Sequence, residues 1–175
     1  MVDFVDSAVV AITNNTDLTE AYHDFFEAYG KRLVETSQRI KPIEEKVKFA
    51  FLERMDTAVF NAIWEFETYY DQLYYKDSIL TDVDYIKCLS INPFGKYMDY
   101  LLLVGEKDQR YLEWHDFILS MGDLSTSGGL WVVHDEYDFG LVENRILAAV
   151  YILRMEDSYE TKLDRYFSEE SHRSR

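Results

Sequence analysis

The chain has 175 residues, of which 47% are hydrophobic and 16% aromatic, enough for one folded domain and unlike a disordered chain. Its 33 acidic and 18 basic side chains give a net charge of −15. A field of this sign repels nucleic-acid phosphates and anionic lipids, so we expect neither direct nucleic-acid binding nor membrane binding. The single cysteine, Cys88, excludes an internal disulfide and zinc clusters built on paired cysteines, and is interpreted as a small core residue.

The N-terminal residues do not resemble a secretory signal peptide, and no membrane span is expected. A short apolar stretch in residues 1–16 has no basic region before it, and Asp3 and Asp6 interrupt it, unlike in a secretory signal peptide. No stretch approaches the ~20 apolar residues of a membrane span. We therefore expect a cytoplasmic protein in which residues 1–16 and 168–175 are peripheral or frayed.

Apolar residues at steps of three and four predict helices in the first half of the chain. One covers about residues 17–40 and begins at Asp17, which resembles the first residue of a capping box. Pro42 can open a second helix at its first position. Because neither Gly nor Pro interrupts the following residues, one long helix over 42–75 is the simplest interpretation. A short helix over about 82–89 is predicted after it.

An antiparallel helix pair is predicted in the middle of the chain. Asn92 and Pro93 form a helix start, and the helix that they open is predicted to end at Gly105. A second helix over about 106–121 ends at Gly122, because glycine is favoured directly after a helix. The short connection between them is typical of neighbours in a bundle.

The last third of the chain contains a loop and two helices. Residues 124–129 (LSTSGG) are typical of a loop, and 130–134 form at most a short extended segment. The next helix, over 141–155 with Asp138 as its cap, is apolar nearly all round, as in the buried centre of a bundle. A final helix covers about 157–167. Together these elements predict an all-α, single-domain bundle of about six helices.

Four residues are the candidates for a metal site. Glu20 and His23 form a Glu-x-x-His pair, a spacing that places two ligands on one helical face. His134 and Glu136 lie in an acidic turn beside the glycine loop. The alternative is that His23 faces solvent and that the turn is solvated. We predict no cofactor, no metal and no catalytic residue, and keep a carboxylate/histidine metal-dependent enzyme as an alternative.

Charged residues are unevenly placed along the chain. Residues 65–84 hold six acids against Lys76 alone, and residues 156–170 hold six acids against two basic residues. Residues 31–48 have the opposite balance, with six basic and three acidic side chains. The acidity is therefore concentrated in two segments and interrupted by a basic one.

The first acidic segment is interleaved with aromatic residues, as in a contact surface for a basic protein, where charge surrounds aromatic anchors. The alternative is that the rings belong to the core and the acids keep the surface soluble. The predicted partner-binding residues are Glu65, Glu67, Tyr69, Tyr70, Asp71, Tyr74, Tyr75, Asp77, Asp82 and Asp84.

The acidity favours a non-enzymatic inhibitor that occludes a basic partner, such as a nuclease or a nucleic-acid-binding protein. Residues 140–158 (GLVENRILAAVYILRMEDS) are similar to the C-terminal helices of immunity proteins against nuclease toxins, without a diagnostic motif. This resemblance implies an inhibitor of the immunity-protein or phage counter-defence type. A self-associating regulatory or structural domain, hence a homo-oligomer, is the other alternative.

Overall fold

The computed structural model describes residues 1–36, 40–67, 72–81, 88–124 and 129–173, with side chains up to residue 168. Within these residues the chain is mostly helical, with eight α-helices and two small antiparallel sheets. The helices are α1 (Val2–Thr13), α2 (Leu18–Thr36), α3 (Glu45–Leu52), α4 (Thr57–Asn61), α5 (Lys96–Gly105), α6 (Gln109–Met121), α7 (Val142–Arg154) and α8 (Tyr159–Arg173). The strands are β1 (Trp64–Glu67), β2 (Gln72–Tyr75), β3 (Ser78–Thr81) and β4 (Cys88–Ile91), and η1 (His134–Glu136) is a 3₁₀ turn.

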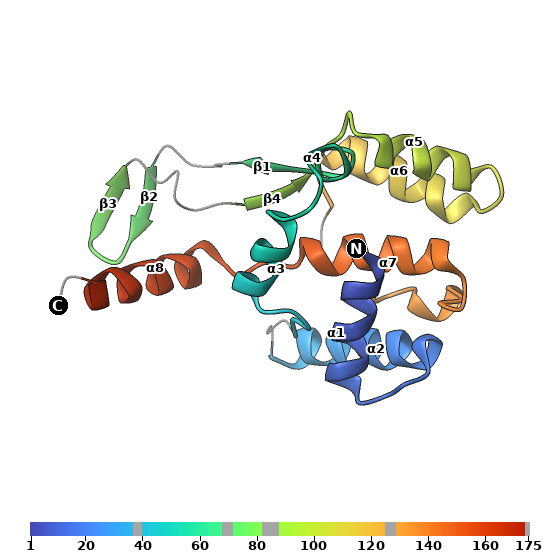
Figure 1. Cartoon of the computed structure of the whole chain (residues 1–175), viewed down its shortest axis with the longest axis horizontal. Helices are drawn as coiled ribbons and strands as arrows, with labels where there is room; N and C mark the ends of the chain where they lie inside the picture. Colours follow the sequence, from blue (N-terminus) through green and yellow to red (C-terminus); the bar gives the residue numbers. More distant parts are fainter. Residues whose placement is uncertain (37–39, 68–71, 82–87, 125–128, 174–175) are drawn as a thin grey trace.

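The molecule consists of a helical body and a projecting arm. In the body, α7 runs between the antiparallel α5–α6 pair and the crossed α1–α2 pair (Figure 1). The arm is the β2–β3 hairpin together with α8, which leads away from the body (Figure 1). None of the helices in the described ranges is long and apolar enough to cross a bilayer.

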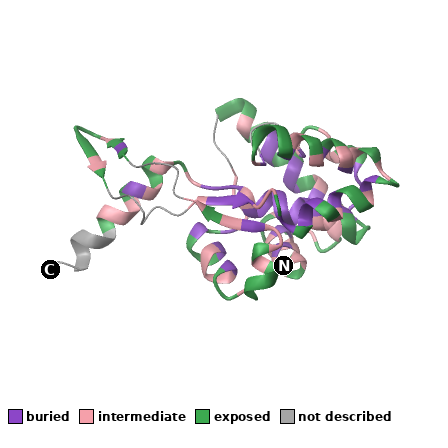
Figure 2. Cartoon of the chain, turned by 90° about the horizontal axis from the view of Figure 1, so that it is seen from above, coloured by how far each residue is buried: buried purple, intermediate pink, exposed green. Residues whose placement is uncertain are grey.

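Helix α7 is the centre of the body, as predicted. Every residue from Leu147 to Leu153 is buried, so no solvent-facing stripe remains in this stretch. Its one buried polar residue, Asn144, accepts a hydrogen bond from the Tyr111 hydroxyl (2.6 Å) and donates one to the Asp138 carbonyl (2.7 Å). Figure 2 shows the buried residues concentrated in the body, with few in the arm.

Three further helices confirm the sequence interpretation. Helix α2 starts at Leu18 and is described to Thr36, within the predicted 17–40. Helices α5 and α6 form the predicted pair, and Gly122 ends α6 in the left-handed region (φ 75°) that glycine favours. Helix α5 begins at Lys96 rather than at Pro93, because the Asn92 side chain accepts from the Phe94 amide (3.0 Å) and holds a turn before it.

The single helix predicted over 42–75 is wrong. The segment forms α3, α4, β1 and β2 instead. Asp56 breaks the helical run, because its side chain accepts from the amides of Ala58 (2.9 Å) and Val59 (3.2 Å) and so starts α4 as a new helix. Neither glycine nor proline is needed for this break.

The short helix predicted over 82–89 is wrong for Cys88 and Leu89, which lie in β4; residues 82–87 lie outside the described residues. Strand β4 pairs with β1 in an antiparallel register that sets Trp64 opposite Ile91. Both of these side chains are fully buried and join the core of the body. The all-α expectation therefore holds only in its coarser form, a mostly helical fold.

The ends and the loop before α7 also differ from expectation. Residues 1–16 were expected to be peripheral or frayed, whereas Val5 and Val9 of α1 are fully buried against the core. Helix α8 continues to Arg173, beyond the predicted end at 167. The described residues 129–134 form turns that lead into η1 rather than an extended segment.

Asp138 does not cap α7 as predicted. The first residue before α7 is Leu141, which has no capping side chain. The Asp138 carboxylate instead accepts from the Gly140 amide (2.8 Å), so it orders the turn that precedes the helix.

Candidate functional site

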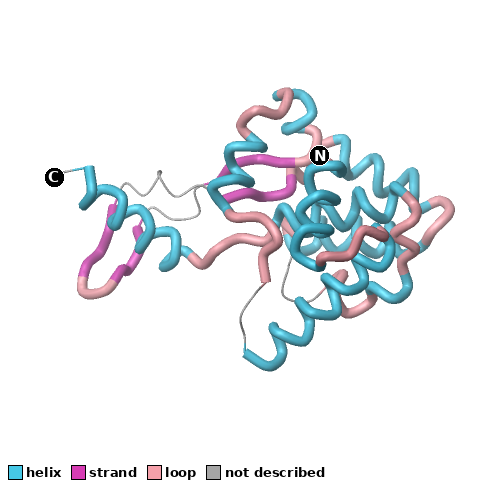
Figure 3. Tube along the Cα trace, turned by 60° about the horizontal axis from the view of Figure 1, so that its bottom comes forward, coloured by secondary structure: helices cyan, strands magenta, loops and turns pink. Residues whose placement is uncertain are grey.

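One face of the β2–β3 hairpin packs on α8. Leu73 and Leu80 lie opposite each other in the hairpin register, and both contact the small apolar cluster around the fully buried Leu163. The Tyr75 ring stacks on Phe167 with 5.3 Å between ring centroids. A two-stranded hairpin alone is marginally stable in water, so α8 supplies the surface on which it folds. The hairpin and the helix run side by side in Figures 1 and 3.

The other face of the hairpin carries an exposed apolar pair. Tyr74 and Ile79 are directly opposite each other in the register and are 72% and 55% exposed. Successive side chains alternate between the faces of a strand, so packing Leu73 and Leu80 on α8 turns Tyr74 and Ile79 outward. Asp77, also exposed, lies in the turn between the two strands.

One carboxylate of α8, Asp164, contacts the end of this hairpin. The Tyr75 hydroxyl donates to Asp164, and the Lys76 ammonium lies 3.4 Å from the same carboxylate. These contacts lower the pKa of Asp164, the Tyr75 hydroxyl first. A hydrogen bond from Tyr159 likewise lowers the pKa of Glu160. Both groups are therefore ionised at neutral pH and keep the arm negative.

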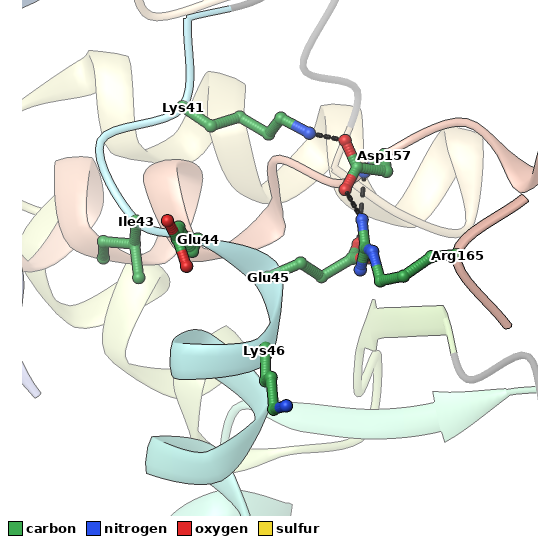
Figure 4. A pocket seen from close by; sticks show the side chains of 7 residues that line it. All are labelled: Lys41, Ile43, Glu44, Glu45, Lys46, Asp157 and Arg165. Atoms are coloured by element: carbon green, nitrogen blue, oxygen red, sulfur yellow. Dashed lines mark hydrogen bonds and ion pairs between the residues drawn. The ribbon is translucent and has the colours of Figure 1, made fainter. Parts of the chain in front are cut away.

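The arm meets the body at a network of ion pairs, which we call the junction: Lys41, Glu45, Lys48, Glu156, Asp157, Lys162 and Arg165. Figure 4 shows its outer part, in which Arg165 of α8 binds Glu45 (Nη1 to Oε2, 2.9 Å) and Asp157. Lys41 pairs with Asp157, whose amide also donates to Glu45 (3.1 Å). A cavity of about 400 Å³ opens beside these side chains.

The inner part of the junction is buried. The Lys48 ammonium donates to the Met155 carbonyl (3.0 Å) and lies 3.5 Å from Glu156. Glu156 also pairs with Lys162 (2.7 Å) and accepts from the Leu89 amide of β4 (2.8 Å). Buried ion pairs contribute little net stability but require specific geometry. The junction therefore links α8 to α3 and β4 through contacts of specific geometry.

Cys88 is half-buried beside the junction, with Sγ 3.8 Å from the Lys162 ammonium. Burial raises the pKa of its thiol. The Lys162 ammonium acts in the opposite direction, but burial is the larger effect, so the thiolate is disfavoured.

The predicted partner-binding residues fall into three groups. Tyr74, Tyr75 and Asp77 lie together on the arm, although the Tyr75 ring is occupied by Phe167. Glu65 and Glu67 lie in β1 of the body, where partial burial and then the neighbouring Glu67 raise the pKa of Glu65. The others lie outside the described residues: Tyr69, Tyr70, Asp71, Asp82 and Asp84.

The sequence interpretation missed Ile79 and Asp164 as parts of the arm surface. Residues 72–81 (QLYYKDSILT) do not alternate between apolar and polar side chains, so no local pattern marked Ile79 as the exposed neighbour of Tyr74. Nothing local marks Asp164, because its proximity to Tyr75 depends on the packing of α8.

Two of the four metal candidates come together. The Nδ1 atoms of His23 and His134 are 3.3 Å apart, and Asp135 adds a carboxylate to the same group. His23 is half-buried and meets the Phe139 ring edge-on at 5.0 Å, so the expectation that it faces solvent is wrong. Burial lowers the pKa of His134, despite the nearby carboxylates of Asp135 and Glu27.

Glu20 and Glu136 do not join this group of metal-ligating side chains. The Glu20 amide takes part in the start of α2 by donating to Asp17 (3.2 Å). The Glu136 carbonyl accepts from Arg110, which lies over the Tyr137 ring at 4.3 Å. The predicted set of Glu20, His23, His134 and Glu136 is therefore replaced by His23, His134 and Asp135.

Comparison with known protein families, with curated proteins and with solved structures found no match to this chain. Its function is therefore argued from its own residues.

Proposed function

We propose that the chain is a non-enzymatic acidic protein that binds a basic protein partner and blocks it, with the outer face of the β2–β3 hairpin as the contact surface. The observation that carries this proposal is the exposed Tyr74–Ile79 pair on a projecting arm of a strongly acidic chain. Aromatic and apolar anchors surrounded by charge are typical of hot spots in protein interfaces.

The charge of the chain supports a basic partner. A net charge of −15 attracts a cationic protein over long range and accelerates its association. A nuclease or another nucleic-acid-binding protein has the complementary basic surface. When such a partner binds to the arm, its own basic surface would be covered.

The test is affinity capture from the native host with the wild-type chain and the Tyr74→Ser/Ile79→Ser double variant. Phe94 provides a matched control, because it is 95% exposed on the loop before α5, away from the arm. We expect wild type and Phe94→Ser to capture the same basic protein. Losing a hot-spot residue costs about 2 kcal/mol or more, so the double variant should bind it at least about 30-fold more weakly.

Measurements with the purified partner complete the test. The wild-type chain should inhibit the partner's own activity stoichiometrically, and the association rate should fall as salt rises. Capture of no basic protein, or equal binding by the double variant, would overturn the proposal. The alternative of self-association predicts instead a wild-type dimer that the double variant loses and that responds little to salt, measurable by analytical ultracentrifugation.

A further inference from the structure

Two segments far apart in the chain bring three metal-ligating side chains together on the surface of the body. His23 comes from α2, and His134 and Asp135 come from η1. The His23 and His134 Nδ1 atoms are 3.3 Å apart, and the His134 Nδ1 lies 3.4 Å from Asp135 Oδ1. One ligand atom from each residue falls within a group that spans 4.8 Å.

These separations match the edges of a metal coordination tetrahedron. Zinc binds imidazole nitrogen at about 2.0–2.1 Å and carboxylate oxygen at about 2.0–2.2 Å, so two ligands at a tetrahedral angle lie about 3.3–3.5 Å apart. The two separations that involve His134 Nδ1, 3.3 Å to His23 and 3.4 Å to Asp135, agree with this value within a tenth or so of an ångström. The His23–Asp135 separation lies within the 4.8 Å that spans the whole group, so the match rests on these two edges. The Nδ1 atoms of the two histidines are therefore already separated like two ligands of one metal ion.

Aromatic side chains pack against both histidine rings and orient them without a bound ion. His23 meets Phe139 edge-on, and His134 lies parallel to Phe26 with 6.2 Å between centroids. The loop before η1 packs closely on α2, because a Cβ added to Gly30 would lie 2.3 Å from Trp131 Cε3. Preorganised ligands lose little conformational entropy when they bind an ion.

Solvent reaches the group from one side. An open groove of about 370 Å³, lined by Phe26, Glu27, Gly30, Trp131 and His134 among others, runs along α2. Glu27 lies one helical turn after His23 and lines the same groove, although its carboxylate is not among the ligand atoms that lie within 4.8 Å of one another. Asp135 is 90% exposed and can turn toward the ion.

We propose that His23, His134 and Asp135 form a binding site for a divalent transition-metal ion, with Zn²⁺ as the representative. Two imidazoles and a carboxylate suit zinc, copper, nickel or iron, whereas calcium and magnesium take all-oxygen sites. The bound ion cross-links α2 to the loop at 129–137, and water completes its coordination. This site is separate from the arm, and its existence does not depend on the proposed function.

The test is Zn²⁺ binding by the purified full chain, measured by isothermal titration calorimetry and by metal analysis after dialysis. We expect a single Zn²⁺ per chain and a higher melting temperature with Zn²⁺ than with a chelator. Loss of a residue that only supports a metal ligand lowers metal affinity about 10-fold or more, and loss of a ligand itself has at least this effect. His23→Gln and Asp135→Asn should therefore bind Zn²⁺ at least about 10-fold more weakly than the wild type.

His115 is the matched control. It lies on α6, its Nδ1 is 3.0 Å from Asp116, and it is outside the group. His115→Gln should bind Zn²⁺ like the wild type. Because Asp135 is exposed, Asp135→Asn should fold normally, with circular dichroism spectra and a metal-free melting temperature equal to those of the wild type. Absence of Zn²⁺ binding, or equal weakening by His115→Gln and His23→Gln, would overturn the proposal.

Discussion

The buried ammonium of Lys48 predicts an alkaline rise in the stability of the protein. Its side chain is at the base of the arm, 1% exposed, with Glu156 at 3.5 Å and the Met155 carbonyl at 3.0 Å as its partners. Burial lowers the pKa of Lys48 to about 8, because Glu156 and Glu45 only partly offset the loss of hydration. Folding at neutral pH therefore requires a charged group in a site that disfavours the charge.

The sign and the size of the change in the free energy of unfolding with pH follow from proton linkage. Below pH ~8 both states are protonated, and above pH ~10.4, the ordinary lysine value, both are neutral. Between these values the unfolded chain binds more protons, so the free energy of unfolding rises with pH. A shift of about 2.5 units corresponds to about 3 kcal/mol in total, of which roughly 2 kcal/mol develops between about pH 7 and about pH 9.5.

The assay is urea unfolding of the wild type and of Lys48→Met at these two pH values. Methionine does not titrate, so the stability of the wild type should rise relative to the variant by roughly 2 kcal/mol. The upper pH value lies below about 10, the pKa at which tyrosines titrate in the unfolded chain. Ionisation of these tyrosines would destabilise both proteins, because burial in the folded state raises tyrosine pKa values, that of Tyr100 to about 12. A stability difference that is the same at both pH values would refute this account of Lys48.

Three further substitutions test the packing. Gly95→Ala would place a Cβ 2.5 Å from the Ala62 carbonyl oxygen, and this backbone clash should cost about 1–3 kcal/mol in urea unfolding. Asp56→Ala removes the cap of α4 and should cost about 1 kcal/mol in the same assay, while Asp56→Asn, which can still cap, should cost much less. Leu163→Ala empties the small cluster under the hairpin, so hydrogen exchange should accelerate at Leu73 and remain slow in α7. Acceleration throughout the body would instead mean that the arm unfolds only with the rest of the chain.

The helices that could be predicted from sequence are those whose signals are local. The apolar spacing of α2 and α7, the last residue of α5 (Gly105) and the glycine after α6 (Gly122) depend on neighbouring residues only. Such signals determine a helix wherever the rest of the chain lies.

The strands could not be predicted from the same signals, because their partners are distant in the sequence. The spacing of apolar residues over 42–75 fits a helix, yet β1 gains its hydrogen bonds from β4 and buries Trp64 in the core. The alternation Trp64–Glu67, aromatic then acidic, is the period-2 pattern that a strand with one buried face requires. Tertiary pairing outweighs the helical pattern here.

In the candidate sites, too, some residues can be identified from local sequence and others only from the fold. Tyr74 and Asp77 could be chosen from composition, because aromatic residues beside acids are visible in the sequence. The proximity of His23 and His134 could not, since the two residues are 111 positions apart and only the packing of η1 on α2 joins them. Asp135 becomes a candidate metal ligand only because of that contact.

The junction changes how the charge pattern of the chain relates to its surface. The basic segment 31–48 and the acidic segment 156–170 meet there, where Lys41 pairs with Asp157 and Lys48 with Glu156. Part of the acidity near α8 is thus internal counter-charge that a partner cannot use. Asp77, in the hairpin turn, and Glu160, in the first turn of α8, are exposed carboxylates of the arm. Because the two oppositely charged segments neutralise each other at the base, the acidity exposed on the surface is smaller than the count of acids in residues 156–170 indicates.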